Sequence, residues 1–135
     1  MKSLHLAGYL EGFYYRPRVD KHLLKEYSEG IICLSACLKG EIQECAVKDD
    51  LNGAKRTAIE YAEIFPGRFY LELQNHNIPE EDISRTAISK LAKELDIPLV
   101  ATNDCHYALQ EHWEAHDIMF CLGTGKDRND PKRQR

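Results

Sequence analysis

The segment Ile97–Tyr107, IPLVATNDCHY, constrains the fold more than any other part of the chain. Its short apolar run, Leu99–Ala101, gives way abruptly to the polar residues 102–104. A nearly continuous apolar run of this length is typical of a buried strand in a parallel sheet. Because functional groups of α/β folds lie just past the carboxyl ends of such strands, the polar residues mark a candidate site.

Asp104 and His106 stand two positions apart in the polar part of this segment. In an extended backbone, side chains two positions apart leave the same face of the chain. A carboxylate oxygen and an imidazole nitrogen on one face form half of a site for a divalent metal ion. The alternative is that Asp104 caps the following helix and that His106 is an ordinary surface histidine.

Two other predicted strands also end in polar residues. The apolar run Ile31–Ser35 is followed by Cys37, and the alternating segment Arg68–Gln74 is followed by His76. Alternation of apolar and polar residues is typical of a strand with one buried face. For Cys37 the alternative is a small buried apolar residue, which is the usual state of a free cysteine.

The ends of the three strands together predict a metal site. Because the carboxyl ends of neighbouring parallel strands meet at one edge of a sheet, we expect Cys37, His76 and the Asp104–His106 pair to converge. Zinc accepts sulfur, imidazole and carboxylate ligands, whereas manganese and magnesium prefer harder oxygen ligands. The ligand types therefore leave the identity of the metal open.

Helical segments are predicted between and beside these strands. Asp49 or Asp50, together with Pro79, supplies start signals, Gly30 supplies a stop signal, and Asp20 is expected in the first turn of the first helix. Strands separated by helices predict an α/β fold with parallel strands and right-handed crossovers. The predicted helices cover residues 19–29, 41–49, 50–64, 79–95 and 110–121.

The two ends of the chain are predicted to be irregular. Residues 1–18 mix aromatic side chains with Arg16 and Arg18, which is typical of a packed turn in which arginine stems cover apolar surface. Stacking of these aromatic rings on nucleic-acid bases is the alternative. Residues 126–135 are charged and contain no apolar residue other than Pro131, so they are expected to form a surface loop or a disordered tail.

Composition restricts the class of protein. A chain of 135 residues with 43% apolar and 30% charged residues fits one globular domain, and its net charge of −4 argues against a general nucleic-acid-binding surface. No apolar stretch approaches the roughly 20 residues that span a membrane, and the N-terminus does not resemble a secretory signal. Five cysteines without a close CxxC pair favour reduced thiols in a cytoplasmic protein.

Three further motifs are candidate sites. His112 and His116 are four residues apart, but Trp113 occupies the position where the zinc-protease helix has glutamate. Residues 123–126, GTGK, follow a helix and lack the spacing of a phosphate-binding loop. Cys37 or Cys105 near His106 is a conceivable nucleophile, but no third residue that would orient the pair is evident. These motifs are weaker than the pattern of strand ends.

Five segments, spread over nearly the whole chain, resemble the PHP (polymerase and histidinol phosphatase) domain of bacterial replicative DNA polymerase III alpha subunits. They occur in the order and at the spacing of that family. They are EGFYYRPRVD (11–20), LSACLKGEI (34–42), FYLELQNHNIPEE (69–81), IPLVATNDCHY (97–107) and AHDIMFCLGTGKDRNDPKRQR (115–135).

The resemblance implies a distorted seven-stranded β/α barrel with a metal cluster at the carboxyl ends of its strands. Residues 1–135 would then be the C-terminal portion of such a domain, because the family's upstream ligands, a His-x-His and an Asp-His, have no match here. The polymerase palm, fingers and clamp-binding regions lie downstream of the matching part. The chain by itself is therefore expected to be inactive, and no catalytic residue is assigned within it.

The family's motifs also suggest individual ligands. Asp104 and His106 fall in its NDxH motif, and Cys37 falls in its S-x-C-L motif. His76 falls in the E-[LI]-Q-x-H segment, close to the cluster. The resemblance implies two or three divalent ions, zinc, manganese or magnesium, in the complete domain.

Two functions are compatible with the resemblance. In some members the domain is similar to a metal-dependent phosphoesterase that proofreads 3′ ends, and in others it is a docking module that holds a separate proofreading exonuclease. Members with lost sites tend to lack histidines at the positions of His76 and His106, and this chain has both. A free-standing phosphoesterase of the histidinol-phosphatase type is a weaker alternative, because FYYRPR and CLGTGK resemble the polymerase branch.

The resemblance further implies that the parent polymerase synthesises DNA and has the sliding clamp and the proofreading exonuclease subunit as partners. A partial barrel exposes strand edges and apolar surface. Self-association of this chain is therefore expected.

Overall fold

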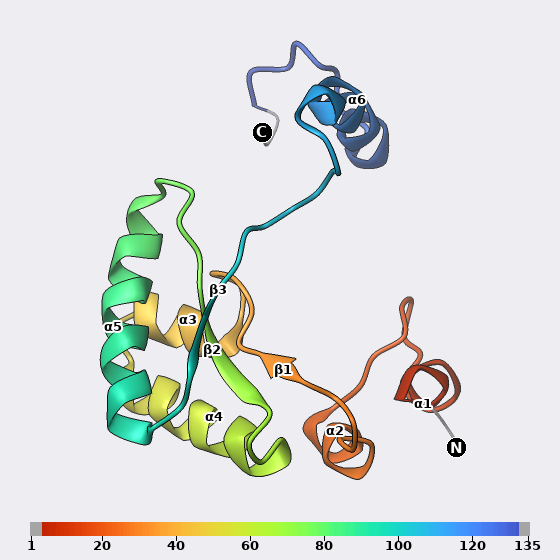
Figure 1. The fold of residues 1–135 in the computed structure, drawn as a ribbon. Helices are drawn as coiled ribbons and strands as arrows, with labels where there is room; N and C mark the ends of the chain where they lie inside the picture. Colours follow the sequence, from red (N-terminus) through yellow and green to blue (C-terminus); the bar gives the residue numbers. More distant parts are fainter. Residues whose placement is uncertain (1–3, 133–135) are drawn as a thin grey trace. The chain divides into compact units, whose positions relative to one another are not determined.

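The computed structural model describes residues 4–132 of the chain (Figure 1). The chain divides into two compact units, one ending at Asn103 and the other beginning at Asp104, and each is described by itself. Within residues 4–132, no helix combines the length and apolar character needed to cross a membrane.

The first unit is built on a parallel sheet of three strands, in the order β1-β2-β3. The strands are β1 (Cys33–Leu34), β2 (Phe69–Leu73) and β3 (Leu99–Ala101). Both pairings are parallel, with Cys33 opposite Phe69 and Leu71 opposite Leu99. The predicted α/β pattern with parallel strands is confirmed, and β3 coincides with the apolar run in the sequence.

Strand β1 is shorter than the predicted strand Ile31–Ser35. The guanidinium of Arg68 donates hydrogen bonds from Nη1 to the carbonyl oxygens of Ser28 (2.6 Å) and Ile31 (3.2 Å). The carbonyl of Ile31 is thus satisfied by a side chain instead of a neighbouring strand. This contact explains why the sheet begins two residues later than the apolar run.

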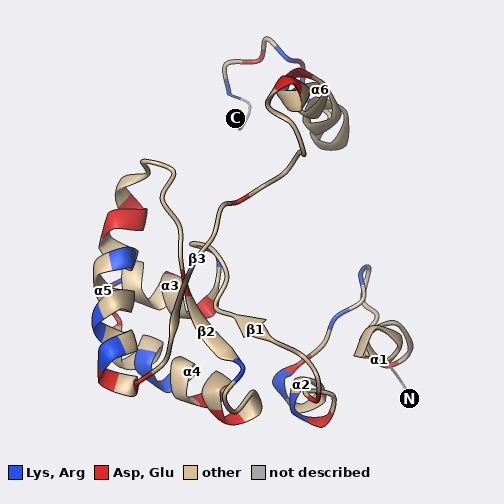
Figure 2. Cartoon of the chain, viewed as in Figure 1, with Lys and Arg blue, Asp and Glu red and all other residues tan. Residues whose placement is uncertain are grey.

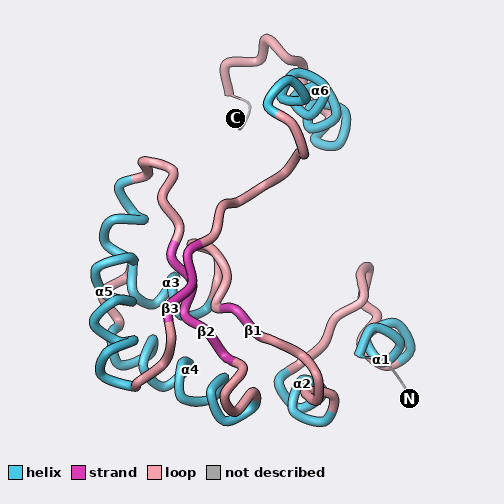
Figure 3. Tube along the Cα trace, in the orientation of Figure 1, coloured by secondary structure: helices cyan, strands magenta, loops and turns pink. Residues whose placement is uncertain are grey.

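Three helices cover one face of this sheet (Figures 1 and 3). They are α3 (Glu41–Val47), α4 (Leu51–Ile64) and α5 (Pro79–Leu95). Helix α4 begins at Asp50, whose Oδ1 accepts a hydrogen bond of 2.8 Å from the backbone N–H of Gly53, so Asp50 and not Asp49 is the cap. Helix α5 begins at Pro79, as the sequence predicts, and its first turn is acidic.

The core lies between these helices and the sheet. Alternate residues of β2, Phe69 and Leu71, are buried, whereas Tyr70 and Glu72 on the other face are only half-buried. The buried apolar residues are Ile42, Ala46, Ala54, Ala58, Ile64, Phe65, Phe69, Leu71, Ile88, Leu91, Ala92 and Ile97. Both acidic and basic residues occur along the same helices, and the first turn of α5 is acidic (Figure 2).

The N-terminal segment differs from the prediction. A helix, α1 (Leu4–Leu10), occupies part of the region expected to be a packed turn. The helix predicted over 19–29 is α2 (Lys21–Glu26). Asp20 precedes that helix as its cap, because its Oδ1 accepts the Leu23 N–H at 2.8 Å, so Asp20 does not lie in the first turn. The helix ends before Gly30, which adopts a positive φ of 75° in the following turn.

Lys21 connects α2 to the helices beside the sheet. Its Nζ lies 2.7 Å from carboxylate oxygens of both Glu41 and Glu60, and 4.9 Å from the centre of the Tyr61 ring. Although partial burial acts to lower the pKa of Lys21, the hydrogen bonds to the two carboxylates outweigh it and raise that pKa. The charged form of Lys21 is therefore the one that the fold favours.

The second unit contains a 3-10 turn, η1 (Gln110–His112), and α6 (Trp113–Thr124). The helix runs three residues beyond the predicted end because the left-handed residue that terminates it is Gly125, with φ 65°. Residues 126–132 form turns, in which Arg128 contacts Glu114 (2.9 Å) and Asp117 (3.1 Å) of α6. Residues 133–135 of the predicted tail lie outside the described part of the chain.

Candidate functional site

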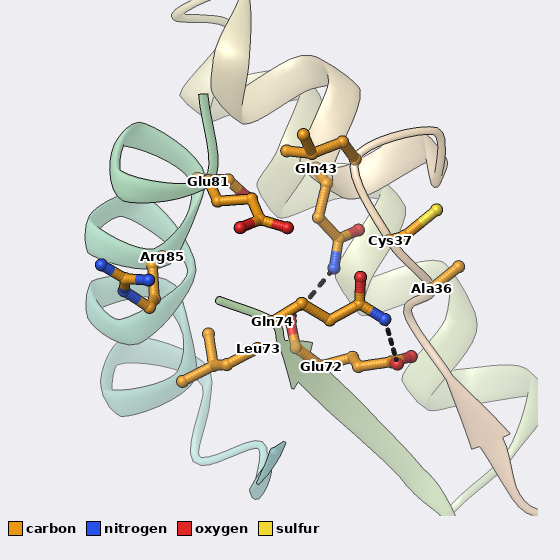
Figure 4. A pocket seen from close by; sticks show the side chains of 10 residues that line it. Ala36, Cys37, Gln43, Glu72, Leu73, Gln74, Glu81 and Arg85 are labelled. Carbon is orange, nitrogen blue, oxygen red and sulfur yellow. Dashed lines mark hydrogen bonds between the residues drawn. The ribbon is translucent and has the colours of Figure 1, made fainter. Parts of the chain in front are cut away.

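A small polar pocket lies at the carboxyl ends of β1 and β2, in the first unit (Figure 4). The space open to the centre of a water molecule in it is about 20 Å³, which suits one water molecule or one ion. The residues that line it include Cys37, Glu72 and Glu81. The pocket is lined by Ala36, Cys37, Leu38, Gln43, Glu72, Leu73, Gln74, Glu81, Ser84 and Arg85.

Cys37 reaches this pocket through a strained turn after β1. Ala36 adopts a left-handed backbone conformation with φ 67°, which costs a residue with a Cβ atom some free energy. The turn directs the chain away from the sheet, and Cys37 is half-buried at the pocket's edge. Nothing in the residue pattern predicts this conformation, because alanine does not favour it.

Gln43, from α3, fixes the floor of the pocket. It is 3% exposed, and its Nε2 donates hydrogen bonds to Ser35 Oγ (2.5 Å) and to the carbonyl oxygen of Glu72 (3.3 Å). The contact with the carbonyl requires an amide nitrogen, so it sets the orientation of the amide group. Within the described residues, Gln43 Oε1 has no hydrogen-bond partner. A buried acceptor of this kind suits a small donor such as water in the pocket.

His76, which follows β2, is held by Glu81 of α5. One oxygen of Glu81 accepts the backbone N–H of His76 (2.5 Å), and the other lies 2.8 Å from Nδ1 of its ring. The hydrogen bond from the backbone of His76 is the main reason why the pKa of the Glu81 carboxyl lies below its usual value. A carboxylate at Nδ1 fixes the orientation of the imidazole ring, as carboxylates do behind metal-bound histidines.

Three polar side chains join the ends of β2 and β3. The hydroxyl of Thr102 contacts a carboxylate oxygen of Glu72, and Nε2 of Gln74 lies 3.1 Å from that oxygen and 3.2 Å from the hydroxyl. Glu72 and Gln74 fall in the E-[LI]-Q-x-H segment, and Thr102 is one of the polar residues after Leu99–Ala101. The residue pattern does not predict that these three side chains meet.

Asp104 and His106 belong to the second unit, where they are in contact. Nε2 of His106 lies 3.2 Å from Oδ1 of Asp104, and the two side chains are 61% and 53% exposed. Asp104 caps neither η1 nor α6, which begin after Leu109 and His112. The convergence of the carboxylate and the imidazole, predicted from their spacing, is present, and the alternative role of Asp104 as a helix cap is wrong.

The His106 ring also contacts α6. Its centroid lies 5.7 Å from that of His116, which in turn lies 5.3 Å from Tyr107 and 6.4 Å from Phe120. His116 was considered in the sequence only as a possible partner of His112. The structure instead brings it to His106, a contact between residues ten apart that helical periodicity does not predict.

Residues 1–76 match the PHP domain. The chain belongs to the PHP domain family. This match contains Cys37, the pocket residue Gln43 and His76, whereas Asp104 and His106 follow it in the chain.

Curated relatives of this PHP chain carry the name DNA polymerase III subunit alpha. The relative from Borreliella burgdorferi is 46% identical over 131 residues, which is 97% of this chain and 11% of the relative. Those from Treponema pallidum and Thermus aquaticus are 45% and 38% identical, over 96% and 95% of this chain and 11% and 10% of the relatives. The chain thus spans about a tenth of the length of these relatives.

The ligands predicted for this PHP chain fit a divalent metal in chemistry but do not form a closed site. In residues 4–132, no three His, Cys, Asp or Glu side chains converge as ligands of one ion. Asp104 and His106 are in contact, with Nε2 of the ring 3.2 Å from Oδ1 of the carboxylate. Cys37 and His76 lie in the first unit, each with its own polar neighbours.

Proposed function

We propose that this chain is the C-terminal portion of the PHP domain of a bacterial replicative DNA polymerase alpha subunit. In the complete domain, the three strands would be part of a distorted seven-stranded β/α barrel. The parent would synthesise DNA, with the sliding clamp and the proofreading exonuclease subunit as partners. The identity of 38–46% with proteins named DNA polymerase III subunit alpha, over nearly the whole chain, supports the proposal.

Within that parent, we assign the chain to a metal-dependent phosphoesterase centre that removes nucleotides from 3′ ends. The contact between Asp104 and His106 carries this assignment, because a carboxylate and an imidazole 3.2 Å apart and open to solvent form a half-site for a divalent ion. Cys37 would be a further ligand, with His76 nearby. Two or three zinc, manganese or magnesium ions would be held in the complete domain.

The residues of this chain would bind the divalent ions and orient the ligands around them. Divalent ions, when bound, activate water and stabilise the negative charge on a phosphodiester. The carboxylate of Asp104 and Nε2 of His106 would hold one edge of the centre. Glu81 keeps its hydrogen bond at Nδ1 of His76, so a proton on that nitrogen leaves Nε2 as the basic atom of the ring.

His106→Ala in the whole alpha subunit tests the assignment. Metal-dependent 3′–5′ exonuclease activity should be lost, and primer extension should continue, because the substitution removes a ligand of the phosphoesterase centre only. The matched control is His112→Ala, six residues later, which should retain both activities. Proofreading that persists in the His106→Ala subunit would show that the assignment is wrong.

A docking module is the second candidate function. Aromatic residues after α1 are well exposed, including Phe13 (57%), Tyr14 (63%) and Tyr15 (83%), and such surfaces often bind other proteins. In this case, a bound metal ion would only stabilise the fold. His106→Ala would then weaken metal binding without changing exonuclease activity. The same experiment therefore separates the two functions.

A further inference from the structure

The loop of residues 11–18, between α1 and α2, gathers exposed aromatic rings beside two arginines. Phe13, Tyr14 and Tyr15 are each more than half exposed. Arg16 and Arg18 are exposed as well, and they are the basic positions that Figure 2 shows in blue on this loop. Aromatic rings and guanidinium groups are therefore open to solvent on one short segment.

The backbone holds the loop in a tight turn around Tyr15. Tyr14 and Arg16 form an antiparallel bridge, in which the N–H of Tyr14 donates to the carbonyl oxygen of Arg16 at 3.1 Å. The N–H of Arg18 donates to the carbonyl oxygen of Gly12, also at 3.1 Å, and a Cβ atom at Gly12 would lie 1.9 Å from the carbonyl oxygen of Arg18. Tyr15 adopts a left-handed φ of 59°, a strained conformation of the kind that gathers at functional sites.

This turn leaves the Tyr15 ring free for a ligand. The rings of Tyr14 and Tyr15 have centroids 4.7 Å apart and planes inclined by 79°. Because the planes are nearly perpendicular, Tyr14 can cover at most one face of the Tyr15 ring, and Tyr15 remains 83% exposed. The guanidinium carbon of Arg18 lies 5.0 Å from the centre of the Tyr14 ring, so a positive charge is held close to the rings.

We propose that this loop binds single-stranded nucleic acid, with a base stacked on Tyr15 and phosphate groups held by Arg16 and Arg18. Stacking on an aromatic side chain requires an unpaired base, which a single strand offers and the interior of a duplex does not. Guanidinium groups bind phosphate oxygens through paired hydrogen bonds. The inference goes beyond the metal centre proposed above and uses none of its residues.

Charge favours a nucleic acid over a protein as the ligand of these rings. The loop contains two arginines and one acidic residue, Glu11, although the whole chain carries a net charge of −4. The carboxylate of Asp20, which follows the loop, is engaged by the Leu23 N–H as the cap of α2. A locally positive segment on an acidic chain suits a polyanion.

A second aromatic–arginine pair, on the other compact unit, provides a matched comparison. The guanidinium carbon of Arg128 lies 5.8 Å from the centre of the Trp113 ring. The same guanidinium forms ion pairs with Glu114 (2.9 Å) and Asp117 (3.1 Å). Because two carboxylates neutralise Arg128, this pair lacks the free positive charge that a phosphate group needs, and we expect it not to bind nucleic acid.

Fluorescence anisotropy of a labelled thymidine oligonucleotide of about twelve nucleotides, mixed with this chain, tests the inference. Tyr15→Leu keeps an apolar side chain but removes the ring, whereas Tyr15→Phe keeps the ring. We expect Tyr15→Leu and the double variant Arg16→Gln, Arg18→Gln each to weaken binding at least about fivefold. Tyr15→Phe should bind as the wild type does, and so should the controls Trp113→Leu and Arg56→Gln, the latter at an exposed position of α4.

Salt dependence separates the phosphate contacts from stacking. For a single strand, each phosphate contact contributes about 0.7 to the slope of log affinity against log salt concentration, so the double arginine variant should lose about 1.4 of that slope. Tyr15→Leu should lower the affinity and leave the slope unchanged. Circular dichroism of each variant checks that the helices are retained.

The wild-type chain provides a readout that needs no substitution. On addition of the oligonucleotide, the ring proton signals of Tyr15 in nuclear magnetic resonance spectra should shift, because a stacked base changes the magnetic field at the ring. The signals of Trp113 should stay in place. Binding that leaves the Tyr15 signals unchanged would overturn the inference.

The choice of probe distinguishes the remaining alternatives. Equal affinity for a duplex of the same length, or unchanged affinity in Tyr15→Leu, would show that binding does not use stacking, and the inference would be wrong. Equal affinity for a uridine oligonucleotide would support the inference and show that the loop does not distinguish RNA from DNA. A wild-type chain that binds no oligonucleotide at low salt would overturn the inference and leave these rings to the docking function.

Discussion

At the scale of single residues, polar side chains near the ends of the strands hold neighbouring elements together through hydrogen bonds. Ser35 illustrates this role. Its hydroxyl accepts hydrogen bonds from Nε2 of Gln43 (2.5 Å) and from the backbone N–H of Glu72 (2.8 Å). One buried hydroxyl thus joins α3 to the ends of β1 and β2, beneath the pocket that contains Cys37.

Ser35→Ala should therefore destabilise the first unit. The substitution removes the hydroxyl acceptor of the Glu72 N–H and one of the two acceptors of the buried Gln43 amide, which costs about 1–3 kcal/mol. The free energy of unfolding from urea titration measures the change. Thr86→Ala is the control, because the Thr86 hydroxyl is exposed and bonds within α5 to the Asp82 carbonyl. Equal effects of the two substitutions would contradict the role of Ser35.

Glu81 should make stability depend on acid pH. Glu81 is 5% exposed, and the pKa of its carboxyl is lowered from the ordinary value near 4.5, chiefly by the hydrogen bond from the His76 backbone. Because the folded state favours the ionised form, its stabilising contribution is complete above about pH 4.5 and is lost as the pH falls through the lowered pKa. At neutral pH, Glu81→Gln should cost about 1–3 kcal/mol.

Urea titrations of the wild type and Glu81→Gln at several pH values measure this dependence. The difference between them should be largest at neutral pH and should shrink in acid, whereas Glu80→Gln, at the preceding exposed position, should show no such trend. A difference that stays constant down to strongly acid pH would contradict the assignment.

At the scale of elements, short polar signals decide where the helices begin. Aspartate side chains cap α2 and α4, and the two hydrogen bonds to backbone N–H groups are each 2.8 Å long. Asp49 and Asp50 are adjacent, but Asp49 adopts a left-handed conformation with φ 61°, while the side chain of Asp50 reaches the first turn. The start of α4 is therefore fixed by one of two similar residues.

Asp50→Ala should destabilise α4 by about 1 kcal/mol, because the N–H of Gly53 loses its acceptor. Asp49→Asn is the matched control, since asparagine tolerates the left-handed conformation and should change stability by less than about 0.5 kcal/mol. Thermal unfolding monitored by circular dichroism compares the two variants. A larger loss in Asp49→Asn would mean that Asp49 is the cap in solution.

At the scale of the whole molecule, many large apolar side chains are exposed. Exposed apolar side chains occur on α1, on the edge strands and on α6, and they include Leu10 (69%) and Leu122 (72%). The sheet has three strands, so β1 and β3 each leave one edge unpaired among the described residues. Such edges and patches favour association with other chains.

We therefore expect the isolated chain to self-associate. Sedimentation velocity over a series of dilutions should show an average mass that rises with concentration. Lysine in place of Met119 and Leu122, both exposed on α6, should shift the distribution towards the monomer if that surface takes part. A single monomer at every concentration would show that the exposed apolar surface does not drive association.

Most of the secondary structure follows from local signals. The apolar run before Thr102 and the proline with acidic residues at the start of α5 give correct elements, because burial of a strand and capping of a helix depend on near neighbours. Strand β1 is shorter than predicted because Arg68, which is distant in sequence, bonds to the carbonyls of Ser28 and Ile31. Helix α1 was not predicted, because aromatic residues mixed with arginines over residues 1–18 are typical of a packed turn.

In the candidate site too, some features follow from the sequence and others only from the tertiary structure. The sequence by itself determined the family, the parallel strands and the Asp104–His106 contact, since spacing along an extended segment fixes which side chains share a face. Only the tertiary structure decided that Glu81 holds His76 and that His116 lies against His106. The physical reason is that these contacts depend on how separate segments pack, which the residue pattern of any one segment does not specify.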